Sequence, residues 1–348
     1  MSSSLIKTRV LIISDTHLAA LEEPGTNGRV AAFQTPLPVA DILIHCGDLT
    51  CYGTLDEFTE AVEMLREIEA PVKLVIAGNH DLSLDREYVL GHLDRKHIDQ
   101  QQGQKTWEQA RQLWTAPDGL AAQAGITFLD EGHHQIDLPN GSRLQVYASP
   151  YTPEFCDWGF PYRKDEDRFN DQASSLLGAK NIAMESVRSF SHNDEPIDIM
   201  ITHGPPYGRL DRTMRRQLVG CPHLLRAVMR ARPLIHCFGH IHEASGAQIV
   251  QWSNEADQIA SKQSTIKAWI DGDWKGGIAD DGNAIRTLTP DLDLAKSHHA
   301  VHINIFDAGE DHVKRGQDTM LVNAAIMNLG GRPLNPPWLI DVPLRTAS

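Results

Sequence analysis

Short apolar runs recur along the chain and predict β-strands that are buried on both faces. Continuous runs of β-branched and other apolar residues are typical of such strands. They lie at residues 10–13, 42–46, 72–77, 197–202 and 234–238. Between the second and third runs, apolar residues recur at helical spacing over residues 55–68. A helix between two such strands predicts a right-handed crossover and parallel pairing.

Further patterns extend this α/β arrangement. Additional strands are predicted at 126–129 and 143–148, joined by a hairpin turn at 139–142, and at 301–306 and 321–325. Residues 85–124 are polar and helix-rich, and residues 150–170 lack a period and are expected to form an ordered loop. We expect one domain over residues 1–348, with insertions near 82–125 and 253–318.

Polar motifs follow the five apolar runs directly. The motifs are Asp15-Thr16-His17, Gly47-Asp48, Gly78-Asn79-His80-Asp81, His203-Gly204 and Gly239-His240-Ile241-His242. Open α/β sheets bind ligands beyond the carboxyl ends of their strands, so these motifs are expected to share one crevice. Carboxylate, imidazole and amide oxygen are ligands of hard or borderline divalent metals. The candidate metal ligands are Asp15, His17, Asp48, Asn79, His203, His240 and His242.

Each of these residues also has an ordinary structural interpretation. A single aspartate after a strand is more often a helix cap or a turn residue, and a single histidine is more often a surface group. The joint order and the shared position at strand ends favour a site with two metal ions. Such ions lie about 3.5–4 Å apart in hydrolases, so one carboxylate can bridge them, and Asp48 is the candidate.

Charge and composition limit the partners. The formal net charge of −14 repels polyanions, so we expect no binding to long nucleic acids. No apolar run is long enough for a membrane span, and the first residues lack a signal-peptide pattern. The five cysteines form no CxxC pair and are expected to be reduced thiols. Together these features predict a cytoplasmic protein without membrane contact.

With these motifs, the sequence resembles the calcineurin-like metallophosphoesterase superfamily. The resemblance implies an α/β fold, a four-layer α/β/β/α sandwich with mixed sheets and surface insertions. It also implies two divalent metal ions. The first would take Asp15, His17, Asp48 and His242, and the second Asp48, Asn79, His203 and His240. Manganese is the first expectation, and iron, zinc, cobalt or nickel also suit a donor set without thiolate.

Several longer motifs resemble one subgroup, the metallophosphoesterase-domain proteins similar to class III cyclic nucleotide phosphodiesterases. They include Cys46-Gly47-Asp48-Leu49-Thr50, Asp157-Trp158-Gly159-Phe160 and Thr202-His203-Gly204-Pro205-Pro206, with an echo at Val322-Asn323-Ala324-Ala325. Asp81 stands where many members have glutamate, whereas His240 is intact although one branch replaces it. The resemblance implies a phosphodiesterase for small substrates such as cyclic nucleotides, acting through a water that bridges the metals.

Roles in catalysis and substrate binding are assigned with alternatives. His80 is the candidate either for protonating the leaving oxygen or for stabilising charge on the phosphoryl group, and Asp81 either orients His80 or caps a turn. Trp158 and Phe160 either stack on a nucleobase or pack beneath the loop. A basic group either meets the substrate or forms a charged surface helix; it comprises Arg209, Arg212, Arg215 and Arg216. The rival functions are a phosphomonoesterase, a phosphoprotein phosphatase, and a non-catalytic scaffold with this fold.

Overall fold

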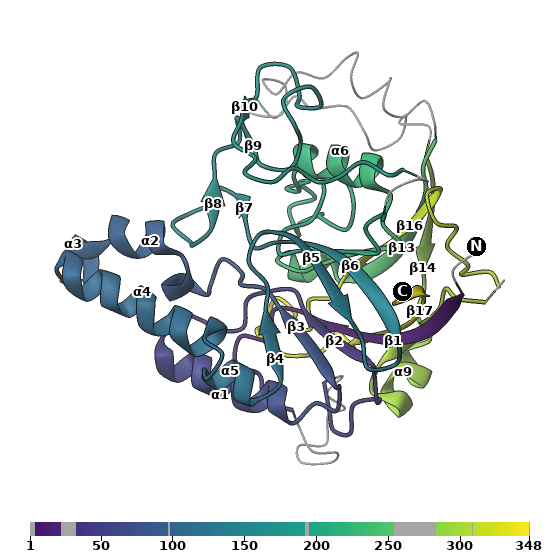
Figure 1. The fold of residues 1–348 in the computed structure, drawn as a ribbon, viewed down its shortest axis with the longest axis horizontal. Coiled ribbons are helices and arrows are strands. Elements are labelled where there is room, and N and C mark those ends of the chain that lie inside the picture. Colours follow the sequence, from purple (N-terminus) through teal and green to yellow (C-terminus); the bar gives the residue numbers. More distant parts are fainter. Residues whose placement is uncertain are drawn as a thin grey trace.

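A sheet of thirteen hydrogen-bonded strands folds back on itself, so that its two halves face each other (Figure 1). The computed structural model describes residues 4–21, 33–96, 98–191, 195–253, 283–307 and 309–347. The first half contains β1 (Leu5–Ile13), β2 (Ile42–His45), β3 (Val72–Val75), β4 (Ile126–Phe128), β15 (Val301–Asn304) and β17 (Trp338–Thr346). The second half contains β5 (Gly132–Asp137), β6 (Ser142–Ser149), β11 (Ile199–Thr202), β12 (Ile235–Phe238), β13 (Gly246–Gln251), β14 (Ala284–Leu288) and β16 (Asp318–Asn323).

The long strand β17 joins the two halves. It pairs with β1 along eight antiparallel positions but with β6 only at Arg345 and Thr346. The strands that carry the motifs are parallel within each half: β1 with β2, β2 with β3, and β11 with β12. Their carboxyl ends therefore lie at the same edge of each half, where ligands of α/β sheets bind.

Successive side chains along each strand point alternately to an inner core, between the two sheet halves, and to one of two outer cores. Val10 and Ile12 of β1 face the inner core with Ile199 and Ile235 of the opposite half. Leu11 and Ile13 face outward, where they join the buried side chains of helices on that side. Because successive strand residues point to opposite faces, one apolar run contributes to two cores. This arrangement confirms the predicted four-layer α/β/β/α sandwich.

Helices cover both outer faces (Figure 1). The first face is covered by α1 (Leu55–Arg66), α4 (Gln100–Thr115) and α5 (Leu120–Gln123), and the second by α6 (Pro222–Ala231). A capping box between Thr54 and Glu57 starts α1, where helical spacing was predicted. With α2 (Arg86–Gly91) and α3 (Leu93–Lys96), α4 forms an arm at the left of Figure 1. The remaining elements are η1 (Leu82–Leu84), η2 (His242–Ala244), α9 (Leu292–His298), β7 (Thr152–Pro153), β8 (Pro161–Tyr162), β9 (Glu166–Asp167) and β10 (Lys180–Asn181).

Two sequence-based expectations are wrong. The turn at 139–142 joins β5 to β6, whereas β4 pairs in parallel with β3. Strand β5 has a half-exposed, polar sequence at a sheet edge, so it carries no apolar run. Residues 209–216 form turns instead of a charged surface helix.

The expected insertion at 253–318 is described only in part. Residues 254–282 lie outside the described residues, and the remainder contributes β14, α9 and β15. Among the helices that the structure describes, none combines the length and the apolar character that a membrane crossing requires.

Candidate metal centre

Five loops converge at the carboxyl edge of the two sheet halves and bring the predicted ligands together. Glycines allow this close approach. A Cβ atom on Gly78 would collide with the carboxylate of Asp48, and a Cβ atom on Gly239 would collide with that of Asp15. These two glycines therefore serve the site through the space that they leave free.

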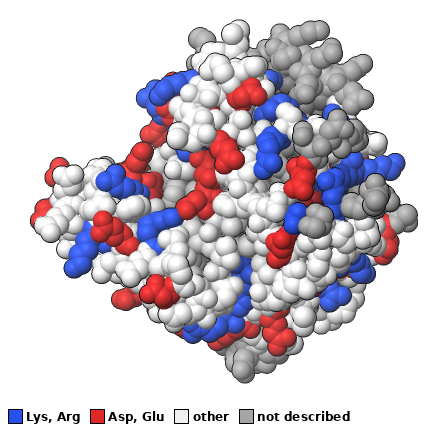
Figure 2. Space-filling model, viewed as in Figure 1, with Lys and Arg blue, Asp and Glu red and all other residues white. Residues whose placement is uncertain are grey.

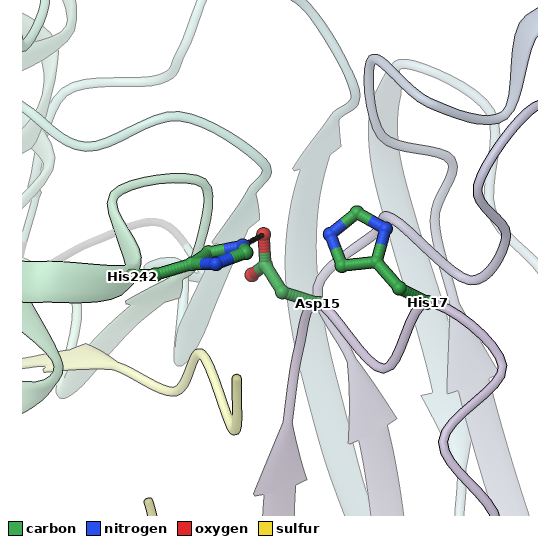
Figure 3. Close-up of side chains that lie close together, drawn as sticks. All are labelled: Asp15, His17 and His242. Carbon is green, nitrogen blue, oxygen red and sulfur yellow. Dashed lines mark hydrogen bonds and ion pairs between the residues drawn. The ribbon is translucent and has the colours of Figure 1, made fainter. Parts of the chain in front are cut away.

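The first ligand group consists of Asp15, His17 and His242 (Figure 3). The Nε2 atom of His242 lies 3.2 Å from Oδ1 of Asp15, and the rings of His17 and His242 are 5.4 Å apart. The backbone N–H of His240 donates to both carboxylate oxygens of Asp15 at 3.0 Å. The loops after β1 and β12 are thus tied together at this carboxylate.

The second group consists of Asp48, His203 and His240, with Asn79 beside them. The Nε2 atom of His203 lies 3.3 Å from Oδ1 of Asp48 and 2.9 Å from Oδ1 of Asn79. The rings of His203 and His240 are 5.1 Å apart. Residues from β2, β3, β11 and β12 therefore meet at one point.

Asp48 lies between the two groups. Its Oδ2 atom is 3.6 Å from Nε2 of His17, whereas its Oδ1 atom faces His203. One oxygen of the carboxylate is thus directed toward each group. A carboxylate in this position could hold an ion on each side, so Asp48 fits the role of a bridging ligand.

Backbone carbonyl groups fix the orientation of two of the imidazoles. The Nδ1 atom of His17 lies 2.9 Å from the carbonyl oxygen of Thr50, and Nδ1 of His203 lies 2.9 Å from that of Cys46. A carbonyl oxygen only accepts, so Nδ1–H donates in both cases. The Nε2 atoms are then left to face the centre, as is usual for histidines that bind metals.

The environment of His203 fits a divalent cation. Its Nδ1–H is committed to Cys46, and its Nε2 faces the oxygen atoms of Asn79 and Asp48. A neutral imidazole carries only one N–H, so the position near Nε2 requires either a second proton or a metal ion. Buried carboxylates, imidazoles and an amide oxygen together form a donor set for divalent metals.

The pKa values of the site residues also indicate a place for positive charge. Burial opposes ionisation of Asp48, but the neighbouring His203 and His17 outweigh it and hold its pKa well below the ordinary value. Burial likewise opposes protonation of His203, yet the charges of Asp48 and Asp15 raise the pKa of His203 to about 9. For His240, burial dominates and lowers the pKa to about 4.

Four of the seven candidate ligands have left-handed backbone conformations. The φ angles are +53° at Asp15, +42° at His17, +57° at Asp48 and +67° at His240. Such conformations are uncommon for residues with side chains and cost of order 1–3 kcal/mol each. They persist where the surrounding structure imposes them, which is typical of functional sites.

His80 lies beside the ligand groups, but the group that orients its ring is not the expected Asp81. Its Nδ1 atom lies 2.8 Å from the carbonyl oxygen of Cys51, and its ring stacks on Trp158 at 3.9 Å. Its ring also falls within one ligand group with His17 and Asp48. The expectation that Asp81 orients His80 is corrected, because the Cys51 carbonyl occupies that position.

Asp81 instead fastens the loops after β2 and β3 to each other. Its carboxylate accepts hydrogen bonds from the backbone N–H groups of Gly78, Leu49 and Thr50 and from the hydroxyl of Thr50. Burial, followed by the nearby charge of Asp48, raises the pKa of Asp81 to about 6. The side chain acts on the geometry of the loops and makes no capping hydrogen bond to η1, the helix that follows it, so the capping interpretation is not supported either.

The residues considered as substrate contacts differ in burial and in their neighbours. Phe160 is buried in an outer core, which supports packing, whereas Trp158 lies against His80. Arg209 is fully buried, whereas Arg212, Arg215 and Arg216 are exposed. The backbone carbonyls of Cys46, Thr50 and Cys51 were not anticipated, because a sequence does not show which carbonyl groups turn toward a site.

Comparison with known proteins identifies the family. A family model described as calcineurin-like phosphoesterase matches residues 8–244. Metallophosphoesterase domain-containing protein 1 of Homo sapiens is 32% identical over 69% of this chain and 62% of its own length. Probable rhamnogalacturonate lyase C of Emericella nidulans is 30% identical over 70% of this chain but only 18% of its own length. The UPF0046 protein K07C11.7 of Caenorhabditis elegans is 28% identical over 68% of this chain and 64% of its own length.

The chain thus spans less than two thirds of the length of each of these relatives. The matched residues 8–244 include every candidate metal ligand and most of both sheet halves. The family match and the clusters of metal-binding side chains therefore fall on the same part of the chain. On this basis the chain belongs to the calcineurin-like phosphoesterase family.

Proposed function

We propose that this protein is a dinuclear metal-dependent phosphodiesterase that hydrolyses small phosphodiesters, cyclic nucleotides among them. The main support is the position of Asp48, whose two carboxylate oxygens face two separate groups of ligands. A site for two ions suits a substrate whose phosphate oxygens need charge compensation on both sides of the reacting phosphorus.

The contacts described above support two ligand sets. Asp15, His17, Asp48 and His242 would hold one ion, and Asp48, Asn79, His203 and His240 would hold the other. When bound, two divalent ions neutralise phosphate charge and lower the pKa of a coordinated water toward neutrality. The donor set contains no thiolate, so manganese is the proposed metal, with iron, zinc, cobalt and nickel as competitors.

His80 has the position of a general acid. Its Nδ1–H is held by the carbonyl oxygen of Cys51, so Nε2 is the atom that exchanges a proton with the substrate. Water adds to phosphorus, one ester P–O bond breaks, and the leaving oxygen takes the proton from His80. Stacking on Trp158 fixes the plane of the imidazole during this transfer.

A substrate panel tests the proposal. Purified, manganese-supplemented protein is assayed with bis-p-nitrophenyl phosphate, p-nitrophenyl phosphate, 2′,3′-cAMP and 3′,5′-cAMP. We expect the diesters to be preferred. A clear preference for the monoester would instead identify a phosphomonoesterase, and elemental analysis near zero would indicate a scaffold without chemistry.

The proposal includes a cytoplasmic location and no binding to long nucleic acids. The five cysteines are free thiols, as in a reducing compartment, and the net charge is −14. Cell fractionation and a duplex-DNA binding assay at low salt test these points. Recovery outside the cytoplasmic fraction, or DNA binding that weakens with salt, would contradict them.

A further inference from the structure

A cavity of about 270 Å³ lies beside the candidate metal centre, between the α2–α4 arm and the loops around β7 and β8. Three aromatic side chains contribute to its lining: Tyr88 of α2, Tyr151 before β7, and Trp158. Carboxylates from both sides of the cavity also line it, at Glu87 and Glu154. We call this the aromatic–acidic pocket.

The pocket is held at a fixed position relative to the catalytic residues. Trp158 lines it and also stacks on His80 with ring centroids 3.9 Å apart. The backbone N–H of Gly159 donates to the carbonyl oxygen of Asn79 at 3.0 Å, and that of Phe160 donates to Asp85 at 2.6 Å. Trp158 is therefore shared by the pocket and by His80, the candidate general acid.

The pocket is acidic, whereas the candidate metal centre would carry the positive charge of two bound ions. Glu87 and Glu154 are exposed, and among the described residues neither forms an ion pair, although Arg163 interacts with Glu154 electrostatically at longer range. Asp157 is already engaged by His92, with 2.8 Å between its Oδ1 and Nε2. Acidic side chains gather on this face between the arm and the rest of the molecule (Figure 2). A second phosphate group would be repelled there.

Aromatic rings beside carboxylates are suited to bind ammonium groups. The negative faces of tyrosine and tryptophan attract cations, and quaternary ammonium ions in particular bind in aromatic cages. Tyr151 already interacts with a cation in this way, since the guanidinium of Arg168 lies 3.4 Å from its ring centroid. Arg168 is itself neutralised by Glu131 at 2.8 Å, so the pocket retains its negative character.

We propose that the aromatic–acidic pocket binds an ammonium group on the leaving alcohol, so that the preferred substrates are phosphodiesters of amino alcohols. This inference rests on the proposed phosphodiesterase function and narrows its substrate class. In the reaction, the water oxygen forms a bond to phosphorus while the P–O bond to the amino alcohol breaks. The alcohol oxygen keeps the bonding electrons and takes a proton from His80, and the phosphomonoester of the other alcohol remains.

Two substrates that differ only in charge test the contribution of the ammonium group. Methyl choline phosphate and methyl 3,3-dimethylbutyl phosphate have the same shape, but only the first carries a positive charge. We expect kcat/KM to be roughly 10-fold or more higher for the choline ester, as a cation–aromatic contact with nearby carboxylates allows. Phosphorus NMR should show methyl phosphate as the product, because choline is the group that leaves.

Glu87→Gln with Glu154→Gln removes the charge and keeps the size of the side chains. The ratio of kcat/KM for the two esters should fall toward one, whereas Glu60→Gln, at an exposed position on α1, should keep the ratio. No preference in the unmodified protein, or a preference unchanged by the double substitution, would overturn the proposal. If the double substitution lowered kcat/KM for 2′,3′-cAMP as much as for the choline ester, the proposal would also be overturned, and the pocket would be assigned to a nucleobase.

Binding of choline alone separates this inference from the proposed function. Choline should quench tryptophan fluorescence through Trp158, and 3,3-dimethylbutanol should do so much more weakly. Selective choline binding without hydrolysis of any diester would support the pocket and refute the phosphodiesterase. Diester hydrolysis without choline binding would support the phosphodiesterase and refute the pocket.

Discussion

Asn323 donates a hydrogen bond from its side-chain amide to the carbonyl oxygen of Ile241 at 2.9 Å, midway between the candidate ligands His240 and His242. It is fully buried at the end of β16 and also donates to the carbonyl oxygen of Leu210 at 3.1 Å. Two residues later, Ala325 pairs with Ser14, which precedes Asp15. A segment beyond the family match at 8–244 thus fastens two ligand loops.

Replacing Asn323 with alanine should weaken metal binding. The loss frees the Ile241 carbonyl, so His240 and His242 no longer share a fixed geometry. We expect manganese affinity to fall roughly 10- to 100-fold, as for other groups that orient ligands. Isothermal titration with manganese on metal-free protein measures this directly.

Asn181→Ala is the control, because Asn181 also donates two hydrogen bonds from its side-chain amide, to the carbonyl oxygen of Asn170 and to Oγ of Ser175, but lies outside both ligand loops. It should cost about 1–3 kcal/mol of stability with unchanged metal affinity. Equal effects of both substitutions on the affinity would mean that Asn323 acts only through general stability.

Asp48→Asn should remove both metal ions together. Asp48 is directed toward both ligand groups, and an amide offers one oxygen and no charge. We expect the metal content to fall from about two ions toward zero, with activity reduced on the order of 100-fold or more. Elemental analysis after gel filtration gives the stoichiometry. If the variant still held two ions, Asp48 would not be the bridging ligand.

The strand-end motifs were predictable because they combine two local signals. A buried parallel strand gives a continuous apolar run, as at residues 10–13, and a ligand directly after it breaks the run with a carboxylate or imidazole. Each strand end could be located from neighbouring residues, whereas the metal site followed from the joint order of the five motifs. The fold of the two sheet halves followed from the family resemblance and is supported by the alternating cores.

The supporting contacts were not predictable because they are set by tertiary geometry. The Cys51 carbonyl at His80 has no side-chain signature, and the adjacent Asp81 was expected either to orient His80 or to cap a turn, whereas its carboxylate binds the hydroxyl of Thr50. Strand β5 was missed because a polar edge strand lacks an apolar run. Glu87 and Glu154 approach the same cavity only through the packing of the arm.

His80→Ala should affect substrates according to their leaving groups. A general acid matters most for a poor leaving group such as an alkoxide and little for p-nitrophenolate. We expect kcat to fall about 100-fold or more for 2′,3′-cAMP, and much less for bis-p-nitrophenyl phosphate, with metal content unchanged. Steady-state kinetics with elemental analysis of the same sample tests this.

The substitution His134→Ala serves as the control for this comparison, since His134 lies on β5, outside the candidate metal centre, and its Nε2 lies 2.9 Å from the carbonyl oxygen of Asp130. Uniform loss on both substrates together with loss of metal would instead make His80 a ligand. Its grouping with His17 and Asp48 leaves that outcome open to measurement.

His236 should make the protein less stable in acid. It is fully buried on β12, and its Nε2 lies 2.8 Å from Oγ1 of Thr202, whose own hydrogen is donated to the carbonyl oxygen of Gly204. Nε2–H therefore donates, and the ring is neutral. Burial lowers the pKa of His236 to about 3 from the ordinary value of 6.5.

The imidazole of His236 binds a second proton more readily in the unfolded chain than in the folded chain. The stability that the neutral, buried ring contributes is therefore complete above pH 6.5 and is lost as the pH falls toward 3. Between pH 7.5 and 5 the loss is about 2 kcal/mol. His236→Gln keeps a donor and cannot titrate, so its free energy of unfolding should change by about 2 kcal/mol less over this interval. Urea unfolding at both pH values, with EDTA present to exclude metal effects, gives the difference, and parallel pH profiles for the two proteins would show that His236 is not the titrating group.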